Sequence, residues 1–194
     1  MVSHNIPIRQ GRRGPGIRIE ISQWDTGWVR KDFLIERTGY AGGMALFAGT
    51  FENKIDAKGR VSVPAPFRAE LEGQRANQLF LFPSFTCTAI EAGTVEWMEE
   101  IKQGLKDRNE FSPERRALTT AIFGRARPVR MDDMGRLVLP RDFAEFAGIS
   151  GRATFVGQAD TFQIWEPAAA QKAQEEAVRQ VIENGLTLGP GGGL

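Results

Sequence analysis

The chain has very few of the side chains on which active sites and covalent cross-links depend. Its 194 residues include one cysteine, Cys87, so no disulfide can form within the chain, and we expect this thiol to lie buried in a strand. The only histidine is His4, so residues 44–194 can provide neither a histidine base nor a Ser–His–Asp triad. No Cys/His cluster has metal-ligand spacing, and no glycine-rich phosphate loop opens a helix. These absences argue against an enzyme and predict neither a cofactor nor a metal.

Long apolar stretches are missing as well. No run of about 18 apolar residues could form a membrane-spanning helix, and the polar N-terminus lacks the apolar core of a signal peptide. We therefore expect a cytoplasmic protein that has no membrane partner. The hydrophobic content of 41% is typical of a globular chain, and 194 residues leave room for one or two small domains.

Net charge gives no sign of a polyanionic partner, because 25 basic and 24 acidic residues leave the chain at +1. Residues 44–194 by themselves carry slightly more acidic than basic side chains. This balance argues against a nucleic-acid-binding protein unless the positive charge is concentrated locally. Such a concentration occurs around one short motif.

This motif occurs twice, at residues 55–67 and at residues 131–143. The two copies are IDAKGRVSVPAPF and MDDMGRLVLPRDF. Asp, Gly, Arg, Pro and Phe fall at the same places in both, and the hydrophobic positions correspond. A repeat this close predicts two like modules related by a pseudo-two-fold axis.

Each copy predicts a tight β-hairpin. In the first copy, residues 51–55 and 60–63 have the composition of strands, and Asp-x-x-Gly between them is typical of a turn. An aspartate can accept hydrogen bonds from the N–H groups ahead of it, and glycine adopts positive φ at little cost. The residues expected to orient the two turns are Asp56, Gly59, Asp132 and Gly135.

An arginine follows each turn and is predicted to lie away from the core face, because side chains alternate along a strand. Each Asp–Arg pair, Asp56–Arg60 and Asp132–Arg136, could simply brace its turn, and an exposed pair of this kind contributes about 0–1 kcal/mol. The surrounding cations favour a second interpretation, contact with the phosphates and base edges of a DNA duplex. The candidate DNA-binding residues are Lys54, Lys58, Arg60, Arg125, Arg127, Arg130 and Arg136.

These residues resemble those of a known family. The segment from Met44, MALFAGTFENKIDAKGRVSVP, resembles the start of MraZ proteins, and the paired Asp-x-x-x-Arg motifs resemble the two tandem SpoVT/AbrB-type modules of that family. The resemblance extends from about Met44 to about Ile182. It implies an α+β fold of two tandem AbrB-like β-hairpin or barrel modules, with pseudo-two-fold symmetry and flanking helices.

The resemblance also implies a function. It indicates a bacterial, nucleoid-associated DNA-binding transcriptional regulator, a repressor of the promoter of the division and cell-wall gene cluster that includes its own gene. Its partners would be double-stranded promoter DNA with repeated boxes and further copies of itself in a ring-shaped homo-oligomer. The second copy of the motif differs from the first at one turn position, where Met134 stands in place of Lys58. The two hairpins therefore need not contact DNA equally.

The repeat divides the chain into five expected parts. Residues 1–43 do not fit the repeat, and they are either a disordered basic extension or the product of a misassigned start, with Met44 as the natural one. The other parts are a first SpoVT/AbrB-like module at 48–95, connecting helices at 96–123, a second module at 124–167, and a C-terminal helix with a glycine-rich tail at 168–194. The apolar stripes of these helices predict core or subunit contacts. Ser112 and Pro113 predict the start of one helix, with serine as its cap.

Two other functions stay open at this point. A carboxylate-only hydrolase would use pairs such as Glu99–Glu100, which we interpret as a solvated helix face. A ring-forming protein-interaction module without DNA binding would use the duplicated hairpins to hold a protein. The two hypotheses differ in one respect, because an interaction module would have no affinity for the DNA upstream of its own gene.

Overall fold

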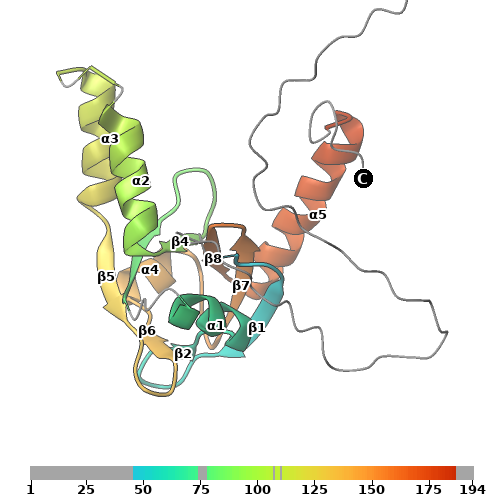
Figure 1. Cartoon of the computed structure of the whole chain (residues 1–194). Helices are drawn as coiled ribbons and strands as arrows, with labels where there is room; N and C mark the ends of the chain where they lie inside the picture. Colours follow the sequence, from blue (N-terminus) through green and yellow to red (C-terminus); the bar gives the residue numbers. More distant parts are fainter. Residues whose placement is uncertain (1–45, 74–77, 107, 110, 187–194) are drawn as a thin grey trace, which may run out of the picture. The chain divides into compact units, whose positions relative to one another are not determined.

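Antiparallel strands from both halves of the chain interleave in the computed structural model, which describes residues 46–73, 78–106, 108–109 and 111–186. Six of the eight strands in these ranges form one sheet, in the order β1-β7-β8-β4-β3-β5, and β2 and β6 form a separate ribbon (Figure 1). The strands are β1 (Thr50–Lys54), β2 (Arg60–Ser62), β3 (Gln78–Pro83), β4 (Ile90–Gly93), β5 (Arg127–Arg130), β6 (Arg136–Val138), β7 (Arg152–Gln158) and β8 (Thr161–Trp165).

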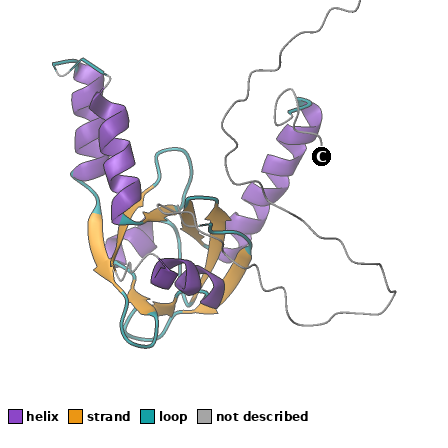
Figure 2. Ribbon diagram, in the orientation of Figure 1, coloured by secondary structure: helices purple, strands orange, loops and turns teal. Residues whose placement is uncertain are grey.

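Helices recur at equivalent places in the two halves (Figure 2). A short helix begins in the last residues of each copy of the motif, and a longer helix follows the last sheet strand of each half. The helices are α1 (Ala65–Gly73), α2 (Val95–Lys106), α3 (Pro113–Phe123), α4 (Arg141–Phe146) and α5 (Pro167–Glu183).

The strand order of the sheet has the internal symmetry that the repeat predicts. If β1, β3 and β4 are exchanged for their counterparts β5, β7 and β8, the order is unchanged when counted from the other edge. β4 pairs with β8 at the centre, and β1 and β5 each pair with a strand of the opposite half. The α+β class is therefore confirmed. The AbrB-like modules at 48–95 and 124–167 stay a prediction, since strands from both ranges share one sheet.

The expectation of a self-contained hairpin in each module is wrong in its strand pairing. In the first copy, the pairing across the turn stops at a single bridge between Ile55 and Val61. β1 then pairs with β7, and β2 pairs with β6. The Asp–Gly turn reverses the chain, but the buried side of β2 meets its apolar partner in the other copy, where Val61 lies opposite Leu137.

The main core lies between the ribbon, the two short helices and one face of the sheet. Phe67 of α1 is fully buried at its centre. Its ring lies 5.3 Å from those of Phe47 and Phe51 and 5.2 Å from that of Phe162, measured between ring centroids. The motif and the sheet contribute further buried side chains to the same cluster: Val61, Val63, Leu137, Leu139, Phe143, Leu79, Leu81, Phe155 and Ile164.

The longer helices contact side chains that alternate with those of the main core. Phe82 follows Leu81 on β3, and its ring stacks on Trp97 of α2 with 5.4 Å between centroids and 7° between planes. Val156 and Trp165 form a smaller buried cluster with Ala170, near the start of α5. Because neighbouring residues of a strand point to opposite faces, the first turns of α2 and α5 pack on the face opposite the ribbon.

Of two local predictions, one is confirmed by the structure and the other is wrong. The predicted helix start is confirmed, because Ser112 Oγ accepts a hydrogen bond from Arg115 N at 3.1 Å and Pro113 opens α3. The expectation that Cys87 lies buried in a strand is wrong. This residue precedes β4 in a loop and is half-buried. The extension at 1–43 and the tail from residue 187 lie outside the described residues.

Replacing Phe67 with alanine should lower the free energy of unfolding by about 3–5 kcal/mol, because a large buried ring is lost from a close-packed core. Urea denaturation followed by circular dichroism measures this change. The control is Leu46→Ala, which shortens an apolar side chain that is 63% exposed and should change stability by no more than about 0.5 kcal/mol. Equal stability of the two variants would contradict the assigned core.

Candidate nucleic-acid interface

The β2–β6 ribbon has one buried and one outward face. Val61 and Leu137 pair at its centre, are both buried, and occupy equivalent places in the two copies of the motif. Their neighbours alternate to the other side, so the outward face carries four side chains. In cross-strand pairs these are Arg60 with Val138 and Ser62 with Arg136. Both arginines stand on one small surface, with 32% and 33% of their side chains exposed.

Asp56 organises the first turn through both of its carboxylate oxygens. Oδ1 accepts hydrogen bonds from the backbone N–H groups of Lys58 at 2.9 Å and Arg60 at 3.0 Å. Oδ2 accepts from Arg60 Nε at 2.7 Å and lies 2.7 Å from Arg60 Nη2. One edge of the guanidinium is therefore fixed against the turn that precedes it.

Asp132 repeats this geometry in the second turn. Its Oδ1 accepts from Met134 N at 3.0 Å and from Arg136 N at 2.9 Å. Its Oδ2 accepts from Arg136 Nε at 2.9 Å and lies 2.8 Å from Arg136 Nη2. The repeat of sequence is thus a repeat of atomic contacts, and it presents two arginines in the same orientation relative to their own turns.

The two turns are also joined to each other. Val63 N donates to Gly135 O, and Leu139 N donates to Gly59 O, both at 2.9 Å. The glycines have φ of +75° at residue 59 and +69° at residue 135, a region that other residues rarely adopt. A side chain at Gly135 would also collide with the side chain of Arg68. Because β2 and β6 are antiparallel and each turn precedes the arginine of its own strand, these contacts fix the two turns at opposite ends of the short ribbon.

The two Asp–Arg pairs interact electrostatically with each other. The hydrogen bond from the Arg60 side chain, helped by that from its backbone N–H, lowers the pKa of Asp56 from 3.8 to about 2. Arg136 lowers the pKa of Asp132 in the same way. The hydrogen bond to Asp132 raises the pKa of Arg136, and the charge of Asp56 adds to this effect across the ribbon. Both aspartates and Arg136 are therefore charged at neutral pH.

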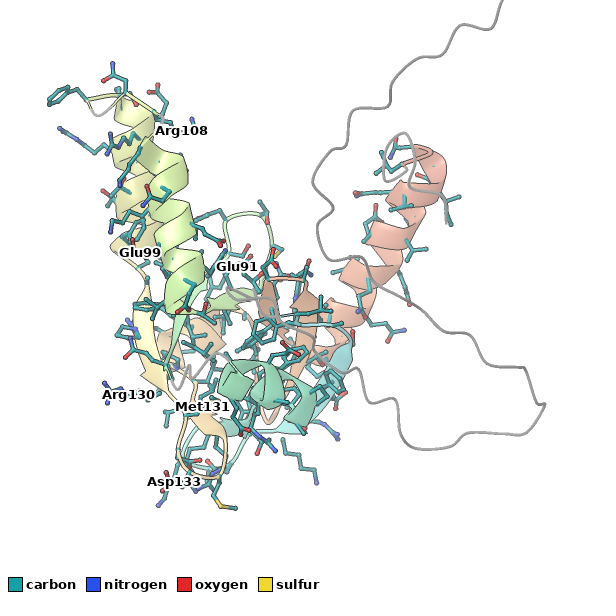
Figure 3. The ribbon with its side chains drawn as sticks, in the orientation of Figure 1. Glu91, Glu99, Arg108, Arg130, Met131 and Asp133 are labelled. Atoms are coloured by element: carbon teal, nitrogen blue, oxygen red, sulfur yellow. The ribbon has the colours of Figure 1, made fainter. Side chains whose placement is uncertain are left out.

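The other predicted DNA-binding residues fall into two groups. Lys54 ends β1, Arg130 ends β5, and Lys58 lies in the first turn. All three are exposed, and none forms an ion pair with the residues that the structure describes. Figure 3 shows Arg130 and Asp133 at the end of the molecule where the turns lie, whereas Arg108 lies at the tip between α2 and α3.

Arg125 and Arg127 are engaged with α4 instead. Arg127 binds both carboxylate oxygens of Asp142, at 2.6 and 2.8 Å, and its guanidinium carbon lies 4.7 Å from the centroid of the Phe143 ring. Arg125 lies 5.9 Å from the ring centroid of Phe146. The structure therefore brings Lys54, Lys58, Arg60, Arg130 and Arg136 to the turns and ribbon, and holds these two arginines beside α4.

Ser62 and Val138 are part of the outward face but were not among the predicted site residues. The alternation of side chains along each strand indicates their outward orientation, because Ser62 follows the buried Val61 and Val138 follows the buried Leu137. Val138 has an apolar side chain that is 54% exposed. It was passed over because an apolar residue in a strand is ordinarily assigned to the core.

Two other features were not found in the described ranges. Within them, no group of three or more His, Cys, Asp or Glu residues could hold a metal ion. No helix in those ranges is long and apolar enough to cross a membrane. The ribbon and its turns are therefore the feature in which the repeated sequence, the charges and the geometry coincide.

A known protein family matches both parts of the chain that form the ribbon. A family model described as "MraZ protein, putative antitoxin-like" matches residues 46–85 and 122–184. These two ranges contain both copies of the motif and every strand and turn of the ribbon.

Curated relatives match most of the chain. The transcriptional regulator MraZ of Beijerinckia indica is 40% identical over 138 residues, which cover 71% of this chain and 84% of the relative. The proteins of the same name from Pelagibacter ubique and Rickettsia canadensis are each 37% identical, over 74% and 75% of this chain and 92% and 97% of their own lengths. The name describes a regulator of transcription, which is not a class of enzyme.

Stability should depend on acid pH through the two aspartates. The pKa of Asp56 is lower in the folded chain, so the unfolded chain binds the proton more readily. The stabilisation by this carboxylate is therefore complete above pH 3.8 and is lost as the pH falls toward about 2. The pKa of Asp132 is shifted in the same direction. Urea midpoints measured across this range should fall more steeply for the parent than for Asp56→Asn/Asp132→Asn.

The control for that experiment is Asp160→Asn. Asp160 is exposed in the turn between β7 and β8 and forms no ion pair with a described residue. This variant should keep the steep pH dependence of the parent. If the double variant also keeps it, the two carboxylates do not stabilise their turns.

Proposed function

Because the chain belongs to the MraZ family, we propose that it is a transcriptional regulator whose β2–β6 ribbon binds double-stranded DNA. The observation that carries the proposal is the pair of equally oriented arginines on one outward ribbon face. A two-stranded ribbon fits the major groove of B-DNA, where arginine can donate two hydrogen bonds to O6 and N7 of guanine. The names of the relatives support regulation of transcription.

The ion pairs leave the arginines able to bind a base. Asp56 and Asp132 accept from Nε and Nη2, which form one edge of each guanidinium. A guanidinium has five N–H donors in a planar fork, so donors on Nη1 and Nη2 still point away from the aspartate. We propose that these donors bind guanine and that the aspartates hold them in position before DNA arrives. Pre-organisation of this kind lowers the entropy cost of binding.

The neighbouring cations would set the register of the ribbon on the duplex. Lys54, Lys58 and Arg130 are exposed and free of ion pairs within the described ranges, so they suit contacts to phosphates. Arg125 and Arg127 would bind phosphate only by sharing or leaving their present contacts with α4. We therefore assign the first three residues the larger part of the salt-dependent affinity.

Assembly into a ring is part of the same proposal. α5 carries Val178, Val181 and Ile182, which are all exposed although they share one side of the helix. α3 carries an open apolar groove lined by Phe111, Pro113, Arg116, Ala117, Thr120, Ala121, Gly124 and Arg125. If α5 of one copy packs in the α3 groove of the next, the contact joins two different surfaces, and such contacts generate rings when the rotation closes.

A ring would explain how a nearly neutral protein binds DNA. Each ribbon offers few contacts, but several linked ribbons on repeated boxes raise the overall affinity by multivalency. We propose that the ring covers the promoter of the division and cell-wall gene cluster, including its own gene, as a repressor on the nucleoid in the cytoplasm. The family to which the chain belongs supports this choice of target.

DNA binding is tested with Arg60→Ala/Arg136→Ala on a fragment from upstream of this gene, by fluorescence anisotropy at two salt concentrations. The parent should bind with an affinity that depends on salt and sequence. The double variant should lose about 30-fold or more, because each arginine–guanine pair contributes about 1–3 kcal/mol. The matched control is Lys102→Ala/Arg179→Ala, which removes the same charge from α2 and α5.

Two outcomes would contradict this proposal. Equal binding by the parent and the double variant would reduce the arginines to turn braces. An absence of binding by the parent would instead favour a protein-interaction ring without affinity for DNA.

Ring assembly is tested with Ile182→Glu, which places a charge on the proposed α5 contact. Sedimentation velocity should show a closed oligomer for the parent and smaller species for the variant, because a buried, unpaired charge weakens an apolar contact. The control Gln180→Glu adds the same charge at an exposed position on the opposite side of α5 and should leave assembly unchanged. A parent that sediments as a monomer, or a variant that assembles like the parent, would contradict the proposed contact.

A further inference from the structure

The outward face of the ribbon differs between its two halves at one position. The copies of the motif align Ser62 with Val138, so the repeat carries a hydroxyl in one strand and an apolar side chain in the other. The cross-strand register then places Val138 opposite Arg60 and Ser62 opposite Arg136. Side chains directly opposite each other in an antiparallel pair have Cβ atoms about 4.5–5.5 Å apart. Each arginine therefore stands beside a partner of different chemistry.

Val138 has no evident role in the core. Its neighbours Leu137 and Leu139 are buried, whereas 54% of its own surface is exposed. A single exposed valine is common on proteins. Here, however, it occupies one of only four outward positions of the ribbon, and the other three are polar. Apolar side chains make favourable contacts with the C5-methyl group of thymine in the major groove.

We propose that Val138 is a specificity-determining residue that contacts a thymine methyl group beside the guanine bound by Arg60. Ser62 occupies the equivalent place beside Arg136 and hydrogen-bonds to a base edge. This inference rests on the proposed function, because it requires the ribbon to lie in the major groove. It adds that the two halves of the ribbon prefer different base pairs.

The two turns of the ribbon also differ in charge. The first turn carries Ala57 and Lys58 where the second carries Asp133 and Met134. Met134 is 70% exposed, so the second turn presents a thioether and a carboxylate where the first presents an ammonium group. Approach of phosphates is favoured at the first turn and disfavoured at the second. The ribbon therefore binds its site in one direction, with the Arg60–Ser62 strand entering from a fixed side.

The test removes thymine methyl groups from the DNA without altering its hydrogen-bonding edges. The upstream fragment is amplified with deoxyuridine in place of thymidine, and its affinity is compared with that of the ordinary fragment. The parent should bind the deoxyuridine fragment about threefold to fivefold more weakly for each ribbon engaged, the factor expected for losing one buried methyl group. Val138→Ser should lose most of this penalty. Ser62→Val, which places a second valine on the face, should increase it.

The matched control is Val95→Ser, which makes the same chemical change at a valine that is 43% exposed at the start of α2 and should keep the penalty of the parent. Circular dichroism establishes that each variant is folded before its affinity is compared. If the parent binds both fragments equally, or if Val138→Ser keeps the full penalty, the inference is wrong although the protein binds DNA. If the parent binds neither fragment, the proposed function fails and the inference fails with it.

Discussion

The structure depends on the pairing of β2 with β6. Had each strand paired fully with its own neighbour across the turn, the two copies of the motif would form separate hairpins. Instead, Val61 meets Leu137 at the centre of the ribbon, and both side chains belong to the core that contains Phe67. The pairing therefore ties the ribbon to the sheet through apolar packing. It also places two arginines from distant parts of the sequence on one face.

The Asp–Arg pairs matter more for orientation than for stability. An exposed ion pair contributes about 0–1 kcal/mol, and these pairs are about one-third exposed. Yet the same four contacts occur in both turns, with each aspartate bound to two backbone N–H groups and one guanidinium edge. Bracing the turn and presenting the arginine are thus two results of one geometry. The first interpretation does not exclude the second.

Local elements could be predicted from the sequence better than the contacts between distant segments of the chain. The Asp-x-x-Gly turn, the alternation around Val61 and the serine cap of α3 are set by neighbouring residues, so the pattern alone indicates them. Period two shows which side of a strand is buried but not which strand it pairs with, and the cross-pairing was therefore missed. The ion pair of Arg127 with Asp142 was missed for a similar reason, because it joins β5 to α4. Val138 was missed for a different reason, because an apolar residue in a strand is ordinarily assigned to the core.

Methylation interference distinguishes base contacts by Arg60 and Arg136 from contacts to phosphates alone. The upstream DNA is partly methylated at guanine N7, which lies in the major groove, and bound and free molecules are then compared base by base. Bound DNA should be depleted of methyl groups at particular guanines within repeated boxes, because N7 accepts a hydrogen bond from Arg60 or Arg136. Interference confined to adenine N3 in the minor groove, or binding insensitive to methylation at any guanine, would contradict the claim that the ribbon arginines contact bases.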